Sequence, residues 1–287
     1  MRIIETIKEL QAALSVHKKA GKSIGLVPTM GYLHEGHLTL AKNAKEENDL
    51  VVMSIFVNPT QFGPNEDFES YPRDLPRDAA LAESVGVDFI FAPSVEEMYP
   101  TDGGIRIHAG RQATILCGAS RPGHFDGVLQ VVAKLFHIVG PDRAYFGQKD
   151  AQQLAIISTM VRDYNFPIEI RPVPIVREES GLAKSSRNVY LSDEEKMNAV
   201  ALYEGLQAVK NAVLQGGSID YAIEQAKKAM EQKTGGKVDY LECLAYPDLT
   251  PIDENTTDVL LATAVYVGKT RLIDNVMFNM KEIKAHV

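Results

Sequence analysis

Short apolar runs alternate with amphipathic segments along the first 175 residues. Five runs are apolar on both faces or rich in β-branched residues, as in a sheet covered on both sides; they lie at 23–29, 49–57, 87–93, 143–147 and 168–176. Segments with apolar residues at helical spacing separate them; they lie at 37–48, 74–85, 127–140 and 150–165. This alternation predicts an α/β domain over 1–175, with a Rossmann-like, doubly wound parallel sheet.

The N-terminal segment shows helical spacing only. Ile4, Ile7, Leu10 and Leu14 recur three or four positions apart, and Gly21 follows them. This pattern predicts a helix that ends before the glycine.

After about residue 176 the alternation stops. Ser192 and Glu195 form a capping-box pattern at the start of a helix. Two helices and two strands are predicted in this part; they lie at 193–215, 218–233, 238–246 and 258–268. We therefore expect a second, smaller α+β domain over 176–287. The polar, glycine-containing segment at 176–192 would join the domains as a hinge or lid.

Composition narrows the class of protein. The net charge is −8, from 30 basic and 38 acidic residues, which argues against broad nucleic-acid binding because that needs a basic field. No apolar run approaches the roughly 18–20 residues of a membrane helix, and the N-terminus lacks the apolar core of a signal peptide. Cys117 and Cys243 have no CxxC partner, so neither disulfides nor a zinc site are expected. We predict a cytoplasmic protein that binds neither nucleic acid nor membrane.

Three polar loops come directly after predicted strands. Their sequences are PTMGYLHEGH, NPTQFG and GQKD. Because ligands in open α/β sheets bind beyond the carboxyl ends of the strands, these loops are expected to converge on one crevice.

The first loop contains two histidines, His34 and His37, separated by Glu35 and Gly36. If a helix opens near Gly36, its free N–H groups favour a phosphate and the imidazoles can donate hydrogen bonds to it. Zinc sites of the HExxH type need histidines four positions apart, so the spacing of three argues against zinc. Taken alone, the pattern also fits loop histidines without chemistry.

A fourth polar stretch, GLAKSSRN, places Lys184, Ser185, Ser186 and Arg187 together. Two cations and two hydroxyls supply the charge neutralisation and the directional donors that a triphosphate needs. Taken alone, such a run also fits solvated surface.

Together, HEGH after the first strand and KSSR far downstream resemble the two-part ATP site of the adenylate-forming nucleotidyltransferases of the HIGH/KMSKS type. Within that superfamily the chain resembles the pantothenate synthetase (pantoate–β-alanine ligase) family. The matching stretches run in order over most of the first 191 residues; they are PTMGYLHEGH, SIFVNPTQFGPNEDFESYPRD, RPGHFDGV, AYFGQKDAQQ and VREESGLAKSSRNVYL.

The resemblance implies ATP-dependent condensation of (R)-pantoate with β-alanine. Pantoate would form pantoyl adenylate and release pyrophosphate, and β-alanine would then displace AMP to give pantothenate. Magnesium would accompany ATP, and no tightly bound, protein-ligated metal is expected. The family resemblance also implies a homodimer.

The resemblance also implies roles for individual residues. The residues expected to bind ATP are Met30, Gly31, Tyr32, Leu33, His34, Glu35, Gly36, His37, Gly147, Gln148, Lys149, Asp150, Val176, Lys184, Ser185, Ser186 and Arg187. Those expected to act in catalysis are His34, His37, Lys149, Lys184, Ser185, Ser186 and Arg187. Gln61 and Gln153 would hold pantoate and later meet β-alanine. Gln61 also fits an ordinary loop glutamine, and Asp150 also fits a helix cap.

Other polar residues receive structural interpretations. We expect His124 and Asp126 to shape the loop at 121–128. Capping and helix-dipole effects explain Asp74 and Asp78, with a water-mediated magnesium contact as the alternative. The residues expected to pack in the core are His137, Met53, Met160 and Phe136.

Two other functions share some of these features. A cytidylyl- or adenylyltransferase of the same superfamily would carry the histidine turn but release a nucleotidyl product. An RNA-binding protein with a synthetase-like core is the alternative from another class, and the acidic charge balance argues against it.

Overall fold

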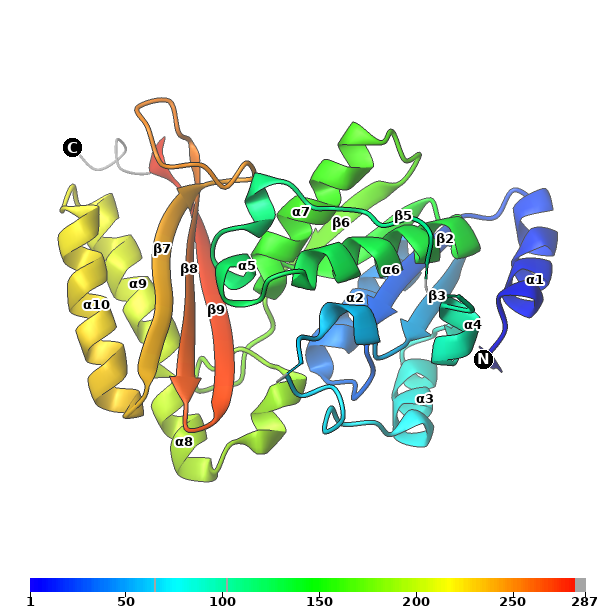
Figure 1. Ribbon diagram of the computed structural model, residues 1–287, viewed down its shortest axis with the longest axis horizontal. Helices are drawn as coiled ribbons and strands as arrows, with labels where there is room; N and C mark the ends of the chain where they lie inside the picture. Colours follow the sequence, from blue (N-terminus) through cyan, green and yellow to red (C-terminus); the bar gives the residue numbers. More distant parts are fainter. Residues whose placement is uncertain (65, 102, 282–287) are drawn as a thin grey trace.

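A six-stranded parallel sheet forms the centre of the larger part of the molecule (Figure 1). The computed structural model describes residues 1–281 except 65 and 102. The sheet has the order β1-β4-β3-β2-β5-β6, and all its pairings are parallel. Its strands are β1 (Arg2–Ile4), β2 (Ile24–Thr29), β3 (Leu50–Ile55), β4 (Phe89–Phe91), β5 (Arg143–Gly147) and β6 (Glu169–Val173). The order reverses between β2 and β5, which is the switch point of a doubly wound sheet, as the sequence predicted.

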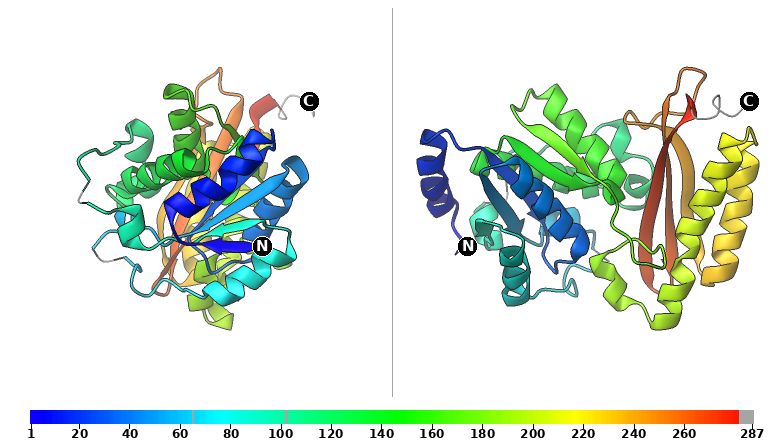
Figure 2. Two further views of the ribbon diagram at one scale, coloured as in Figure 1. Left: turned by 90° about the vertical axis from the view of Figure 1, so that its right-hand side faces the viewer. Right: turned by 180° about the vertical axis from the view of Figure 1, so that it is seen from behind.

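Helices cover both faces of this sheet (Figure 2). Their bounds are α1 (Ile7–Lys19), α2 (Glu35–Glu47), α3 (Leu75–Ser84), α4 (Val95–Met98), α5 (Cys117–Ser120), α6 (His124–Val139) and α7 (Ala151–Asp163). Neighbouring strand residues point to opposite cores: Leu26 packs with α1, α6 and α7, whereas Val27 packs with α2 and α3. Burial on both faces explains why the strands read as continuous apolar runs.

The C-terminal part is a second layered unit. An antiparallel sheet of β7 (Lys237–Ala245), β8 (Asp258–Val267) and β9 (Thr270–Asn279) packs against helices. These helices are α8 (Asp193–Ala199), α9 (Ala201–Leu214) and α10 (Ile219–Thr234), and they share one core with the sheet. The capping box of Ser192 and Glu195 is present, but the long predicted helix divides at Val200 into α8 and α9.

The structure corrects the prediction for the N-terminal segment. Ile4 is not in a helix; it is the last residue of β1, which pairs with β4. The helix begins only at Ile7, because the Thr6 side chain accepts a hydrogen bond from the Glu9 N–H and caps it there. The three-residue edge strand was too short to show a period of its own.

Strand β9, which the sequence did not predict, joins the two parts. Its Asp274 carboxylate forms an ion pair with Arg177, at 2.7 and 2.9 Å. The Asn275 amide donates to the carbonyls of Gln148 and Lys149, both at 2.9 Å. The C-terminal unit therefore lies directly against the loop that follows β5.

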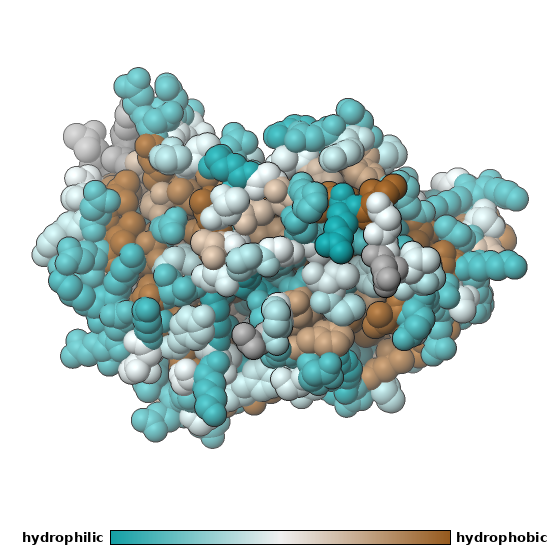
Figure 3. Space-filling view, in the orientation of Figure 1, coloured by the Kyte–Doolittle hydropathy of each residue, from teal (hydrophilic) through white to brown (hydrophobic). Residues whose placement is uncertain are grey.

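Hydrophilic and hydrophobic side chains are interspersed over the face in Figure 3. Among the described residues, no helix combines the length and the apolar character needed to cross a membrane.

Candidate active site

The loops after β2, β3 and β5 meet at the switch point of the sheet. A cavity of about 230 Å³ lies there. Fourteen predicted site residues line it: Met30, His34, Gly36, His37, Gln61, Gly147, Lys149, Asp150, Gln153, Val176, Lys184, Ser185, Ser186 and Arg187. The remaining five lie in the same loops but do not line this cavity: Gly31, Tyr32, Leu33, Glu35 and Gln148. The predicted convergence of the loops is therefore present.

The two histidines lie at the start of α2. His34 is the N-cap, and its Nδ1 accepts a hydrogen bond from the Gly36 N–H at 3.1 Å. The His37 Nδ1 accepts from the His34 N–H at 3.3 Å, and the ring centroids are 4.0 Å apart. Since both Nδ1 atoms accept, each neutral ring carries its proton on Nε2.

Burial keeps both imidazoles neutral. It lowers the pKa of His34 to about 2, with the nearby His37 and Lys149 acting in the same direction. Burial, helped by the Lys149 cation, lowers the pKa of His37 to about 4. At neutral pH each ring is therefore an uncharged donor through its Nε2–H.

Gly36 has a steric role beside the His34 ring. A Cβ at this position would lie 2.8 and 2.9 Å from Cε1 and Nδ1 of the His34 ring. The glycine therefore makes room for the capping imidazole, and it also lines the cavity.

Gln61 is buried at the end of β3, in the short helix Pro59–Gln61, so the interpretation as an ordinary loop glutamine does not hold. Its Oε1 accepts from the Asn58 Nδ2 at 3.1 Å, and its Nε2 lies 3.4 Å from the Met30 Sδ. The Asn58 side chain also accepts from the Tyr99 hydroxyl at 2.8 Å. Asn58, which is 1% exposed, fixes the Gln61 carboxamide and was missed from the sequence, although it follows β3 almost directly.

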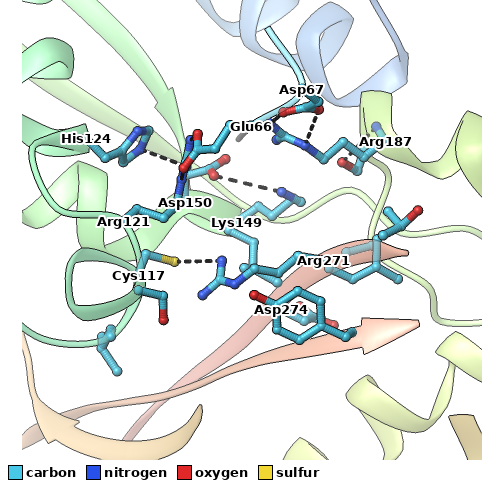
Figure 4. A pocket seen from close by; sticks show the side chains of 18 of the residues that line it. Glu66, Asp67, Cys117, Arg121, His124, Lys149, Asp150, Arg187, Arg271 and Asp274 are labelled. Atoms are coloured by element: carbon cyan, nitrogen blue, oxygen red, sulfur yellow. Dashed lines mark hydrogen bonds and ion pairs between the residues drawn. The ribbon is translucent and has the colours of Figure 1, made fainter. Parts of the chain in front are cut away.

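The loop after β5 brings a cation into the cavity. The Lys149 Nζ lies 3.8 Å from the Asp150 Oδ1. Asp150 stands at the N-cap position of α7, but its side chain makes no capping hydrogen bond. The capping interpretation of Asp150 is therefore wrong. Lys149 and Asp150 line this cavity and also the adjoining cavity that Figure 4 draws.

The KSSR segment packs on the histidine turn, so the interpretation as solvated surface is also wrong. The Lys184 Nζ donates to the Glu35 Oε2 at 2.5 Å, and the buried Ser186 donates through Oγ to the Tyr32 carbonyl at 3.2 Å. The Lys184 N–H donates to the carbonyl of Val176.

Within the segment, the Ser185 Oγ accepts from the Arg187 N–H at 3.3 Å and caps the short helix Ser186–Tyr190. The Arg187 guanidinium forms two hydrogen bonds with Asp67, at 3.0 and 2.9 Å. The guanidinium expected to bind phosphate is thus paired with Asp67, for which the sequence offered no indication of a role.

A second arginine is held in the same way. Arg121 donates to both carboxylate oxygens of Glu66, one of them at 2.7 Å. His124 Nδ1 bonds the Gln61 carbonyl at 2.7 Å, and burial together with Arg121 lowers the pKa of His124 to about 4. Figure 4 shows these side chains around an adjoining cavity of about 1270 Å³ that reaches β9. The shaping role expected for His124 agrees with this geometry.

The remaining structural interpretations have mixed outcomes. Met53, Met160 and Phe136 are buried in the core, as predicted. His137 is not: it is exposed on α6, with Nδ1 bonded to the Ala133 carbonyl and the ring packed on Phe166. The buried residues of α6 continue on both sides of it, at Phe136 and Ile138, so His137 lies on the narrow exposed side of the helix.

The three aspartates of this group also differ. Asp126 bonds His108 and the Ala109 N–H, both at 2.8 Å, and so holds the segment before α5. Asp74 caps α3 through the Arg77 N–H at 3.1 Å. Asp78 does not cap α3; it is buried and accepts from the N–H groups of the histidine turn.

The described residues contain no group of three or more His, Cys, Asp or Glu side chains placed to hold a metal ion.

Comparisons with known proteins find similar sequences and similar structures over nearly the whole chain. The family model described as pantoate–β-alanine ligase matches residues 2–277. Pantothenate synthetase of Lysinibacillus sphaericus (strain C3-41) is 71% identical over 98% of this chain and 99% of its own length. The crystal structure of pantothenate synthetase from Thermus thermophilus superposes with a TM-score of 0.90, at 48% identity, over 96% of this chain and 99% of that one. A second similar structure is that of pantoate–β-alanine ligase from Francisella tularensis complexed with β-γ ATP and β-alanine; it has a TM-score of 0.80 at 38% identity, over 98% of each chain.

Proposed function

Because the chain belongs to the pantoate–β-alanine ligase family, within the HIGH-motif nucleotidyltransferases, it is an ATP-dependent ligase of pantoate and β-alanine, and we propose that the cleft at the switch point is its active site. The Francisella relative is complexed with an ATP species and β-alanine, which supports the same substrates here. The nearly full-length match to the ligase family disfavours a cytidylyl- or adenylyltransferase.

One observation carries the assignment of the cleft. Lys184 and Ser186 form direct hydrogen bonds with Glu35 and Tyr32 beside the cavity, so the two stretches expected to bind ATP meet at its edge. A triphosphate bound there would meet the neutral histidines on one side and the cations Lys149 and Lys184 on the other.

We assign the reaction to two steps. An oxygen of the pantoate carboxylate attacks the α-phosphorus of ATP, the bond to the bridging oxygen breaks, and pyrophosphate leaves. The amine of β-alanine then attacks the acyl carbon of pantoyl adenylate, AMP leaves with the acyl–oxygen electron pair, and the ammonium loses its proton to give the amide. No covalent enzyme intermediate is required, so catalysis rests on positioning and charge stabilisation.

The histidines donate through Nε2–H to phosphoryl oxygens as negative charge develops. They remain neutral, so they stabilise the charge without a proton having to leave the ring. The other groups that bind the triphosphate are Lys149, Lys184 and the hydroxyls of Ser185 and Ser186. Arg187 also binds phosphate, and to do so it leaves its ion pair with Asp67.

Pantoate and adenine are bound by other elements. Gln61 and Gln153 line the cavity from the ends of β3 and from α7, and their carboxamides both donate to and accept from a hydroxy acid. The main chain at Val176 contacts the adenine base. Magnesium would enter with ATP and would supply partial neutralisation of the phosphate charge, without a protein-ligated site of its own.

The larger organisation is proposed on the same basis. Residues 1–175 form the nucleotide and pantoate domain, and residues 176–287 act as the smaller domain that closes over ATP. The family resemblance supports a homodimer in the cytoplasm; sedimentation at several concentrations tests the dimer.

A pyrophosphate assay tests the proposed function. Pantoate and MgATP without β-alanine should release one pyrophosphate per active site, and addition of β-alanine should then release AMP and pantothenate. A failure to release pyrophosphate with pantoate would contradict the adenylate route, and release of a stable nucleotidyl product would indicate the transferase instead.

A further inference from the structure

The turn between β2 and α2 has an unusual backbone. Gly31 and Tyr32 are consecutive residues with positive φ, at 84° and 48°. Tyrosine seldom adopts this region, because its Cβ approaches the following carbonyl oxygen. Some contact from outside the turn must therefore hold residues 30–33 in place.

The Asp78 carboxylate makes that contact from α3. Its Oδ2 accepts from the Tyr32 N–H at 2.6 Å, and its Oδ1 accepts from the Leu33 N–H at 2.7 Å. Successive N–H groups in a left-handed turn form a concavity that binds an anion, and here the anion is a side chain that is 1% exposed. A Cβ on Gly31 would lie 3.0 Å from this Oδ2, so the glycine admits the carboxylate.

Arg77 completes the clamp. Its Nη1 lies 3.2 Å from the Asp78 Oδ1, its Nη2 donates to the Leu33 carbonyl at 2.9 Å, and its guanidinium stacks 4.8 Å from the Tyr32 ring centroid. The buried carboxylate is therefore paired with a cation and two N–H donors.

We propose that Asp78 is a positioning residue for the adenylation step, whose carboxylate fixes the turn that presents His34 and His37. The inference rests on the proposed phosphate-binding role of these histidines. His34 follows the turn directly, and its N–H donates to the His37 Nδ1, so rotation of the turn disrupts both rings. The Tyr32 carbonyl also accepts a hydrogen bond from the Ser186 hydroxyl, so the same turn aligns the KSSR segment.

Asp78→Asn tests the proposal because it keeps the size but replaces one acceptor by an NH₂ donor. That donor would face a backbone N–H in a buried place, which forces the turn to move. Asp74→Asn is the matched control: it makes the same change on the same helix, Asn is a good N-cap, and Asp74 does not contact the turn.

In single turnover with pantoate and MgATP, Asp78→Asn should slow adenylate formation at least tenfold. The dissociation constant of pantoate should change less than threefold, because Asn58 still holds the Gln61 carboxamide and Gln153 lies on α7. By NMR, the pKa of His37 should rise by at least one unit from about 4, because the moved ring becomes solvated. Asp74→Asn should stay within twofold in rate and leave this pKa in place.

Wild-type adenylation by Asp78→Asn would overturn the proposal. So would a slow variant with an unchanged His37 pKa, because the loss would then not act through the histidines. If Asp78→Asn does not fold, Asp78→Glu, which keeps the charge but moves the carboxylate by one methylene away from the Tyr32 and Leu33 N–H groups, must reproduce both effects. Separately, normal adenylation by His37→Ala would refute the proposed role of the histidines, whatever Asp78→Asn does.

Discussion

The two halves of the proposed ATP site are held in different ways. The histidine turn is fixed by hydrogen bonds from its backbone N–H groups to the two imidazoles and to the buried Asp78 carboxylate. In the KSSR segment, by contrast, Lys184 and Arg187 bind the carboxylates of Glu35 and Asp67, with side chains that are partly exposed. The comparison indicates a rigid half that is preorganised for charge stabilisation and an adjustable half whose cations exchange carboxylates for phosphates.

The largest effect is expected from the rigid half. His37→Ala should lower the rate of adenylate formation about 10²–10³-fold, the usual loss for one preorganised donor to a developing oxyanion. Stopped-flow detection of pyrophosphate measures this step, and circular dichroism checks the fold.

His137→Ala is the matched control, since it removes an exposed histidine from α6. It should leave adenylation unchanged. Comparable losses in the two variants would mean that the effect is not specific to the turn.

The same contrast explains how much of the molecule could be predicted. Most of the rigid half is local in sequence: the strand, the HEGH turn and the helix are contiguous, so the pattern predicted these elements, while the family resemblance supplied the expected role of the two histidines between them. Asp78 and Asp67 were not recognised because their roles come from contacts with residues 45 and 120 positions away. From the sequence alone, an aspartate near the start of a helix can equally cap that helix or bind a loop that is distant along the chain.

Strand β9 was missed for a related reason. Asp274 and Asn275 interrupt its apolar pattern and read as a loop, yet both are buried. They are satisfied by Arg177 and by the carbonyls after β5, and these partners became visible only when the two parts were brought together.

The adjustable half should show an intermediate effect on replacement of Lys184. Lys184→Ala should slow adenylation about ten- to a hundredfold, in line with ~1.5–3 kcal/mol for a hydrogen bond to a charged group. Aminolysis of the bound adenylate should lose less, because pyrophosphate has already left. Single-turnover rates of the two steps give the comparison.

Lys42→Ala removes an exposed lysine from α2 and should leave both steps unchanged. Equal losses in the two steps of Lys184→Ala would contradict the assignment of this lysine to the triphosphate.

A smaller effect of opposite sign is expected from Asp67→Asn. It frees Arg187 from a partly exposed ion pair worth at most ~1 kcal/mol, so ATP should bind up to about fivefold more tightly. Isothermal titration with a non-hydrolysable ATP analogue measures this change, and Asp163→Asn, which alters an exposed pair on α7, is the control. Weaker binding by Asp67→Asn would show that Asp67 orients Arg187 for phosphate, so that this half would be preorganised as well.

The smallest change in the adenylation rate is expected from a change of pH. This measurement again tests the histidine turn. Protonation of His37 would remove the Nδ1 acceptor of the His34 N–H, so adenylation needs the neutral ring. Because burial lowers its pKa to about 4, this ring stays neutral on acidification from pH 7.5 to 5.5, and its titration should change the adenylation rate less than twofold. A ring with the unperturbed pKa of about 6.5 would be roughly nine-tenths protonated at pH 5.5 and would cost about tenfold. Single-turnover rates across this range, with NMR titration of the His37 ring, separate the two cases: an inflection near 6.5 that follows the His37 signal would mean that the turn is open to water and not a fixed, buried donor.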